Sequence, residues 1–597
     1  MGAARTSRGC VLRFAISFLS ALALPSVHAQ TTTVAGFTPG SFQVSPSGAA
    51  IYTVPIQVPP GIAGMESKLA LTYNSQGGNG LLGMGWSLSG LSAITRCPRT
   101  VAQDGVKGGI NYDSNDRYCL DGQRLVMIAG ASYGADGAEY RTEQESFTKV
   151  ISYGIGGNGP AWFKAWTKSG QVMEFGLTVD SRVEAQGKTP TVGLWVLNKI
   201  QDTKGNYLTI TYTEDYANGE YYPARYDYTG NAAAGQVTYA SVRFSYATRP
   251  DPIYTNIAGS AIRTSVQLTN IRTYVGEAMI KDYRLNYEQG AAGSRSRLTG
   301  VTECTGDGLS CLPTIAFSWK EPVVGPQNWT WTGGHGVGDS GWQLGDLFGD
   351  GRQVYWTHSG NGTHYATRFV SLAPDLLLSV ANGPNPATTI AYKPLTDGAI
   401  YSKDSGAVYP TRDLKAPIYA VSSTSQTNGI GGNYITNYFY TGAKTHLQGG
   451  GYLGFRKFEM TDAQTNIKTA STFRQDYPFQ GLPISIVKTQ LSGAVLNQVA
   501  TTWTDNPAVN ALTYNFSTGK YHRSDLTQSV ETSNDLNGTV LPTVTTTTSY
   551  DAYGNATGIT VSTGDGYSKT TTNTFTNDTA NWFLGRLTRS QVISTTP

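Results

Sequence analysis

Three stretches of the sequence carry residues in patterns known from catalytic and cofactor sites. Residues 338–341 read Gly-Asp-Ser-Gly, as in the nucleophile segment of serine proteases, and residues 143–145 read Glu-Gln-Glu, the Glu-x-Glu spacing of ADP-ribosyltransferases. A serine nucleophile needs a histidine base and an acid that orients it, and no histidine lies in a recognisable base motif. We interpret residues 143–145 as charge on the surface of a strand. Residues 78–83 match Gly-x-Gly-x-x-Gly but lack the following helix that a dinucleotide needs. We therefore expect neither enzymatic activity nor a cofactor.

One loop could hold a cation. Residues 346–351 resemble an Asp-rich calcium loop, with Asp346 and Asp350 at the first and fifth positions. Calcium prefers six to eight oxygen ligands, and Phe348 and Val354 stand where the third and ninth positions usually supply them. Two carboxylates make a weak calcium site, so we favour a turn without metal.

Four tryptophans lie close together in the same part of the chain: Trp329, Trp331, Trp342 and Trp356. Exposed aromatic rings stack well on sugar faces, whereas buried ones fill the space between strands. The sequence allows either role for these tryptophans. We favour a small core over a ligand platform.

The remaining chemistry is that of cysteine. Cys10 lies in the basic, apolar N-terminal stretch, which we expect to be removed as a leader. Four cysteines then remain: Cys97, Cys119, Cys304 and Cys311. An even number of cysteines in an exported chain indicates disulfides, although four cysteines allow three pairings. We favour the local pairs, 97 with 119 and 304 with 311. The alternative, a zinc site, usually needs Cys-x-x-Cys spacing, which is absent.

The elements that position these residues are predicted to be strands. The sequence contains 70 Gly and 36 Tyr but only 14% charged residues, a composition typical of many short strands joined by tight turns. Tyr52, Val54, Ile56 and Val58 alternate with other residues, as expected for a half-buried strand. We predict an all-β protein of several antiparallel domains. A formal net charge of +3 does not favour nucleic acid as a partner.

The N-terminus has the features of a signal peptide. Arginines at positions 5, 8 and 13 precede an apolar run over residues 14–24, and Val27 and Ala29 are small residues at the positions that a signal peptidase reads. The run is shorter than the roughly 20 apolar residues of a membrane span. We expect a leader over residues 1–29, secretion, and no transmembrane segment.

Shifts in composition suggest the domain boundaries. Residues 30–320 are dense in strand signals, residues 321–375 are rich in Gly and Trp and irregular, and strands resume over residues 376–483. Residues 484–597 are rich in Thr and contain a hairpin unit at residues 550–555.

Several motifs occur in the order found in one known family: residues 39–42, 45–50, 56–61, 71–75, 80–86, 94–97, 118–125, 311–313, 317–319, 451–456 and 477–483. This series resembles the N-terminal and middle regions of SpvB-type virulence proteins and of the B components of insecticidal toxin complexes. The unit at residues 550–555 resembles a YD repeat of the Rhs-like toxins. Because only one Asp-x-x-x-Asp-Gly unit is present, the resemblance implies a degenerate propeller over residues 321–375.

The resemblance implies a delivery or scaffold component that docks or shields a toxic partner. Its partner would be a YD-repeat or toxin polypeptide, or the translocation component, which relatives dock through the propeller region. The alternative is an extracellular or cell-surface binding protein, for example one that recognises glycans through its tryptophans. A third hypothesis is that the protein is an enzyme with an unrecognised site.

Overall fold

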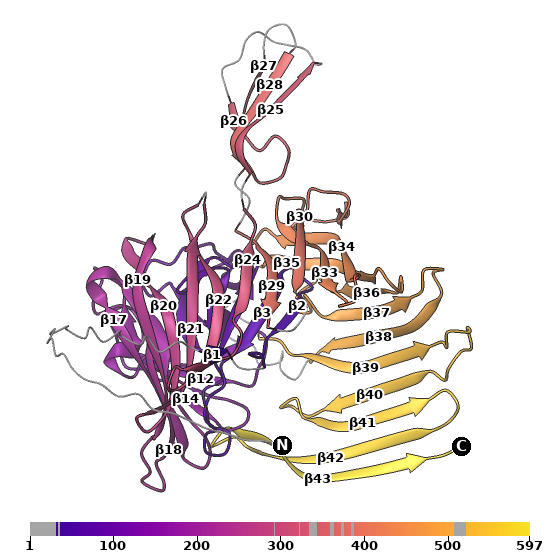
Figure 1. Cartoon of the computed structure of the whole chain (residues 1–597). Coiled ribbons are helices and arrows are strands. Elements are labelled where there is room, and N and C mark those ends of the chain that lie inside the picture. The colour runs from indigo at the N-terminus through magenta and orange to yellow at the C-terminus, as the bar shows by residue number, and fades with distance from the viewer. Residues whose placement is uncertain are drawn as a thin grey trace, which may run out of the picture.

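The computed structural model describes residues 32–33, 36–291, 293–321, 323–332, 343–358, 363–371, 375–383, 387–506 and 521–597. Within these residues the chain is almost wholly β-structured, which confirms the predicted all-β class (Figure 1). Helix is limited to α1 (Val101–Asp104) and two 3-10 turns, η1 (Val179–Ser181) and η2 (Tyr216–Asn218). None of the helices in the described part is long and apolar enough to cross a membrane. The predicted leader lies outside the described residues.

Eight antiparallel strands close into a barrel. Its strands, in order around the barrel, are β8 (Ala93–Cys97), β9 (Arg117–Leu120), β10 (Gln123–Ala129), β11 (Glu139–Thr142), β12 (Lys149–Tyr153), β13 (Trp162–Trp166), β14 (Val172–Phe175) and β16 (Val192–Gln201). The circle closes where β16 pairs with β8, Trp195 opposite Ile94. Large aromatic side chains fill the interior, as in other small barrels: Tyr118, Tyr140, Phe163, Phe175 and Trp195 are all buried.

A buried ion pair lies beside this aromatic core. The Arg96 guanidinium donates to the Asp116 carboxylate at 3.0 Å, and both side chains are almost fully buried. Arg96 also donates to the carbonyl oxygens of Val192 and Asn158, and Asp116 accepts from the backbone N–H of Tyr112. Each charge is thus paired and hydrogen-bonded, which is the condition for keeping it inside a protein.

From β16 the sheet continues as an antiparallel meander (Figure 1). Its first strands are β17 (Asn206–Asp215), β18 (Glu220–Asn231), β19 (Ala240–Ile257), β20 (Ser260–Val275), β21 (Ala278–Gln289), β22 (Ser296–Thr305), β24 (Ile315–Trp319), β29 (Leu377–Asn382), β30 (Thr388–Pro394), β33 (Tyr419–Thr427), β34 (Asn433–His446), β35 (Gly451–Asp462) and β36 (Lys468–Phe473). Short strands accompany the sheet: β1 (Thr32–Thr33), β15 (Arg182–Glu184), β23 (Ser310–Cys311), β31 (Tyr401–Ser402) and β32 (Thr411–Asp413).

A second, smaller sheet packs on this meander. It consists of β2 (Ser41–Val44), β3 (Ala50–Pro55), β4 (Ala70–Asn74) and β7 (Trp86–Ser89). In the sequence between β4 and β7, the two-residue strands β5 (Asn79–Gly80) and β6 (Gly83–Met84) pair with each other. The ring of Tyr52 meets Phe317 edge-on at 5.8 Å, and Tyr73 meets Trp319 at 5.9 Å. These aromatic contacts join the start of the chain to β24.

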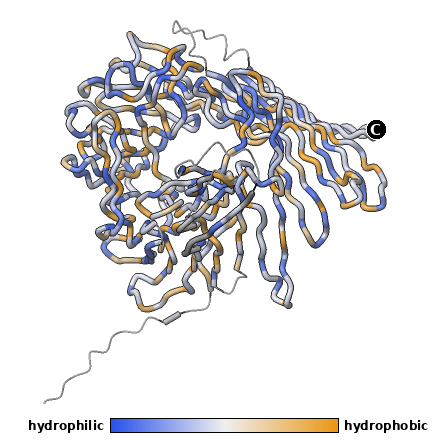
Figure 2. Tube along the Cα trace, turned by 90° about the horizontal axis from the view of Figure 1, so that it is seen from above, coloured by the Kyte–Doolittle hydropathy of each residue, from blue (hydrophilic) through white to orange (hydrophobic). Residues whose placement is uncertain are grey.

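The C-terminal strands form a ladder at one end of the molecule, coloured orange to yellow in Figure 1. They are β37 (Pro483–Thr489), β38 (Val495–Asp505), β39 (Ser524–Ser533), β40 (Val544–Tyr550), β41 (Ala556–Thr563), β42 (Ser568–Asp578) and β43 (Phe583–Thr595). None of the residues in β40, β41 or β42 is fully buried. Consecutive threonines in β40 and β42 point to alternate faces, so both faces of this thin sheet carry partly exposed threonines. Figure 2 shows these strands curving away from the rest, with mixed polar and apolar colours along them.

The hairpin unit at residues 550–555 is the turn between β40 and β41. Asp551 accepts hydrogen bonds from the backbone N–H of Tyr553 and of Asn555, both at 2.9 Å, which fixes the turn. The assignment of this turn to a YD repeat remains a prediction.

Candidate docking site

A four-stranded sheet projects from the end of the molecule shown uppermost in Figure 1. Its strands are β25 (Val323–Thr332), β26 (Gln343–Gly345), β27 (Val354–His358) and β28 (Thr363–Ser371), and we call the segment over residues 321–375 the arm. The arm is inserted between β24 and β29, which pair directly with each other, Trp319 opposite Leu377. Residues 321–375 were expected to be irregular; the described part is instead a regular antiparallel sheet of the size of one propeller blade.

A buried arginine fixes the base of the arm. Arg297 of β22 is 1% exposed and donates through Nε (2.9 Å) and Nη2 (2.7 Å) to the carboxylate of Asp375. Its Nη1 donates to Glu321 at 2.7 Å. Glu321 and Asp375 are the first and last residues of the arm, so one guanidinium holds both ends together through charge-assisted bonds.

The tryptophans of the arm gather around a small core. Trp329 of β25 and Trp356 of β27 both lie opposite Ala366 of β28, so the three residues share one face of the sheet. Ala366 and Val354 on this face are buried, and the Trp329 ring contacts Phe348 at 4.7 Å. Trp331 is paired with His364 along β25, and Trp342 lies outside the described residues. This placement favours the predicted core role for Trp329 and Trp356 over a ligand platform.

The opposite face of the arm exposes large side chains. Tyr355 and Tyr365 lie on it, 47% and 42% exposed, diagonally across β27 and β28. Leu344 of β26 and Leu347 in the loop after it are also exposed. Tyrosine is favoured at protein interfaces because it combines a large apolar area with one polar group.

The carboxylates of the candidate calcium loop accept hydrogen bonds from within the loop. Asp346 accepts from the backbone N–H of Asp350 at 3.0 Å and of Gly351 at 2.8 Å. Asp350 accepts from the backbone N–H and Nε of Arg352 at 3.0 and 2.9 Å. This is the geometry of a turn closed by its own side chains. No group of three or more His, Cys, Asp or Glu side chains suited to a metal occurs among the described residues.

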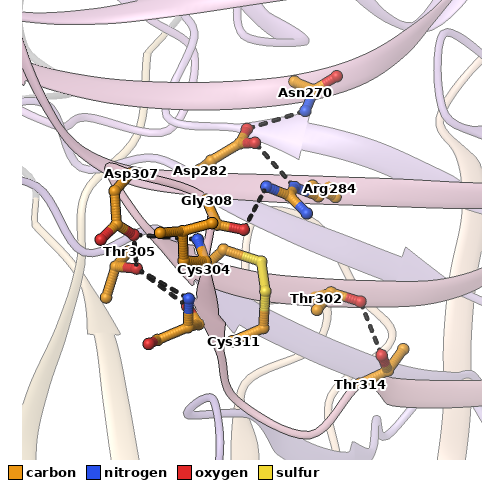
Figure 3. Close-up of a disulfide and its surroundings, with 12 residues drawn as sticks. Asn270, Asp282, Arg284, Thr302, Cys304, Thr305, Asp307, Gly308, Cys311 and Thr314 are labelled. Carbon is orange, nitrogen blue, oxygen red and sulfur yellow. Dashed lines mark hydrogen bonds and ion pairs between the residues drawn. A yellow bond between two sulfur atoms is a disulfide. The ribbon is translucent and has the colours of Figure 1, made fainter. Parts of the chain in front are cut away.

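The cysteines form two disulfides with the local pairing that we favoured, Cys97–Cys119 and Cys304–Cys311. Cys97 and Cys119 join the neighbouring barrel strands β8 and β9. Figure 3 shows the second bridge, which closes the loop between β22 and β23. In that loop the Thr305 hydroxyl donates to Asp307, which also accepts from the backbone N–H of Leu309.

Protein without residues 1–29 is expected to contain no free thiol, which thiol titration in denaturant measures. Reduction should lower stability by about 2–4 kcal/mol per bridge, because a bridge restricts the unfolded chain. The effect grows with the length of the closed loop, so loss of Cys97–Cys119, 22 residues apart, should cost more than loss of Cys304–Cys311, 7 residues apart. Titration of two or more thiols, or the reverse order of costs, would contradict this prediction.

Residues 143–145 do not lie on a free surface, so our interpretation of them as strand-surface charge is wrong. Glu143 accepts a hydrogen bond from the Tyr477 hydroxyl at 3.0 Å, and the Glu145 backbone N–H donates to the carbonyl of His522 at 2.8 Å. Burial raises the pKa of Glu145, and burial followed by the neighbouring Glu143 raises the pKa of Tyr477. The segment joins the barrel to the middle and C-terminal strands.

A tryptophan extends this junction to the end of the chain. Trp582, just before β43, is buried and donates through Nε1 to the carbonyl of Phe147 at 2.8 Å. The Arg141 guanidinium lies 4.3 Å from the centre of its indole. The backbone N–H of Leu584 donates to the carbonyl oxygen of Lys168, in the barrel, at 2.9 Å. We call the contacts of residues 143–149 and 168–169 with Tyr477, His522 and residues 582–584 the seam.

The Gly-Asp-Ser-Gly motif at residues 338–341 lies outside the described residues. The glycines at residues 78–83 form the β5–β6 turn, where Gly83 approaches the backbone of Ser296. The motif is therefore a turn between two short strands, with strand β7 and not a helix after it.

Comparisons with known proteins support a relation to toxin-complex components. A family model described as Salmonella virulence plasmid 65kDa B protein (SpvB) matches residues 44–251, and one described as the middle/N-terminal region of insecticide toxin TcdB matches residues 328–481. Mono(ADP-ribosyl)transferase SpvB of Salmonella typhimurium is 25% identical over 210 residues, which are 32% of this chain and 33% of that protein. The Salmonella dublin protein of the same name matches to the same extent.

The fold is that of solved toxin-complex structures. TcdB2-TccC3 matches with a TM-score of 0.72 at 13% identity, over 97% of this chain and 48% of that one. A Photorhabdus luminescens Tc holotoxin pore matches with a TM-score of 0.71 at 13% identity, over 98% and 47%. The chain thus spans about half the length of the solved chains and a third of the curated relatives.

Proposed function

We propose that this chain is an exported, non-enzymatic component of a toxin complex that docks and shields a toxin polypeptide. The observation that carries the proposal is the arm: a sheet whose two ends Arg297 holds together and which projects from a toxin-complex fold, with exposed tyrosines and leucines. Exposed apolar residues in one place are typical of a protein interaction site. The arm would therefore bind a translocation component or a toxin polypeptide.

The C-terminal ladder supports the shielding part of the proposal. Leu587, Val592 and Ile593 on β43 are more than half exposed. Exposed apolar side chains gathered on one strand are typical of a protein interaction site. A toxin polypeptide could pack against these side chains.

A deletion can remove the arm and keep its base. It breaks the hydrogen bonds that the Thr396 and Tyr419 hydroxyls donate to the carbonyl oxygens of Gly349 and Asp350. Replacing residues 322–374 by Asn-Gly would connect Glu321 to Asp375 by a two-residue hairpin, which suits this dipeptide. Lys320 and Leu376 already share a backbone hydrogen bond, and Arg297 keeps both carboxylates. We expect this variant to stay folded, with a melting temperature close to the parent's, and to lose co-purification with a toxin or translocation polypeptide of a toxin complex.

Point variants refine the experiment. Tyr355→Ala with Tyr365→Ala should weaken the same interaction, whereas Tyr567→Ala, 51% exposed on the C-terminal ladder and outside the arm, should leave it unchanged. Full binding by the armless variant would overturn docking through the arm. Toxicity of the isolated chain inside host cells, lost on Glu145→Ala, would overturn the non-enzymatic role.

A further inference from the structure

A pocket of about 390 Å³ lies between the smaller sheet and the meander, away from the arm and the seam. Its floor comes from β29, β30, β33 and β34, and its wall from β2 and β3. The lining residues are Gly40, Phe42, Tyr52, Val380, Asn382, Thr388, Thr424, Ser425, Gln426, Tyr434 and Thr436. The volume lies within the range of small-molecule sites.

The strand register explains why these residues meet. Val380 lies opposite Thr388, Thr388 opposite Gln426, and Gln426 opposite Tyr434. Directly opposed residues point to the same face of a sheet, so they form one row across four strands. Thr424 and Thr436, also opposed, form a second row beside it. The floor is thus built by regular pairing and needs no loop to assemble.

Aromatic rings line the wall and the rim. Phe42 of β2 is half-buried, Tyr52 of β3 is buried, and Tyr434 is 60% exposed. Gly40 keeps the wall open, because a Cβ at this position would overlap the Tyr52 hydroxyl. Any larger residue at position 40 would displace that hydroxyl.

A buried amide at the pocket has an acceptor that no described residue uses. Asn382 is 8% exposed, and its Nδ2 donates to the Thr38 carbonyl at 2.8 Å and to the Tyr52 hydroxyl at 3.4 Å. Its Oδ1 is buried and accepts no hydrogen bond from any residue that the structure describes. Leaving such an acceptor unpaired costs free energy, and a hydroxyl or amide N–H of a ligand would supply the missing donor.

We propose that this pocket binds a neutral saccharide, with Asn382 and the hydroxyl-bearing strand residues as hydrogen-bonding groups and Tyr434 as the stacking ring. None of the lining residues that the structure describes is charged, so an ionic ligand would lose its hydration without a counter-charge. A purely apolar ligand would leave the Asn382 acceptor unpaired and would displace water from the hydroxyl-bearing lining residues. A sugar matches both properties, since it carries many hydroxyls and an apolar C–H face. The inference is independent of the docking function.

Saturation-transfer NMR and calorimetry on the full chain test the site. The neutral probes are glucose, galactose, N-acetylglucosamine, lactose and N,N′-diacetylchitobiose, and the charged ones are sialyllactose and a heparin disaccharide. We expect at least one neutral probe to bind, and Tyr434→Ala to raise its Kd about tenfold through loss of stacking. Gln426→Ala should also weaken binding, whereas Tyr434→Phe, which keeps the ring, should retain it.

Tyr567→Ala is the matched control and should bind as the parent does. Tyr434 and Gln426 are both exposed, so their variants should fold, which thermal melts confirm. The proposal is overturned if no neutral probe binds at millimolar concentration. It is equally overturned if binding survives both pocket variants, or if the charged probes bind more tightly than the neutral ones.

Discussion

Replacing Asp116 by alanine is expected to lower the free energy of unfolding of the barrel by about 3–5 kcal/mol, the usual result of removing one partner of a buried ion pair. The substitution leaves the Arg96 charge buried without its counter-charge, and it leaves the backbone N–H of Asn111 and Tyr112 without their acceptor. Urea unfolding followed by tryptophan fluorescence measures the change, since Trp195 lies in the barrel.

Two further variants distinguish this explanation from a general effect of losing a charge. Glu277→Ala removes a partner of Arg243 at the surface, where ion pairs contribute little, so its unfolding midpoint should match the parent's. Arg96→Met with Asp116→Leu removes both buried charges and should recover part of the loss. Asp116→Ala with parental stability would show that the pair does not support the barrel.

Replacing Trp582 by alanine is expected to cost about 3–5 kcal/mol, as is typical of large buried aromatic side chains. The variant loses the hydrogen bond to Phe147 and the indole beneath Arg141. We expect the last two strands, β42 and β43, to detach from the barrel while the barrel itself stays folded. The backbone hydrogen bond from Leu584 to Lys168 lies beside the lost indole and should break with it. Limited proteolysis with mass spectrometry should find new cuts after β41 before any in the barrel.

Trp582→Phe separates packing from hydrogen bonding. It keeps an aromatic ring but loses the Nε1 donor, so we expect a smaller loss of about 0.5–1.5 kcal/mol. Tyr567→Ala, on the same ladder but exposed, should leave the cutting pattern unchanged. A Trp582→Ala protein that resists protease as the parent does would show that the seam does not hold the C-terminal strands.

The strands were the most predictable part of the structure. Tyr52, Val54 and Ile56 are all buried, as their alternation indicates, because the period of a half-buried strand is a local property of the sequence. The domain boundaries that the shift in composition suggests at residues 321 and 375 stay a prediction; Arg297 bonds to both of these residues.

Contacts between distant segments could not be predicted. Glu143 and Gln144 each have a partner 334 positions away, Tyr477 and Pro478, so a charged stretch that we interpreted as surface became part of the seam. The saccharide pocket depends on the register of β29, β30, β33 and β34, which involves a step over β31 and β32. No spacing in the sequence indicates which threonines and amides end up in one row.

The order in which the strands of the meander pair also affects how the chain folds. From β16 onward most strands pair with the next strand along the chain, so each hairpin can form as soon as its residues are available. Closure of the barrel by β8 and β16 needs only the first third of the chain. The seam, in contrast, needs Trp582, which lies far beyond the barrel in the sequence. Folding can therefore advance from the barrel, with the Trp582 contact forming after the strands between them.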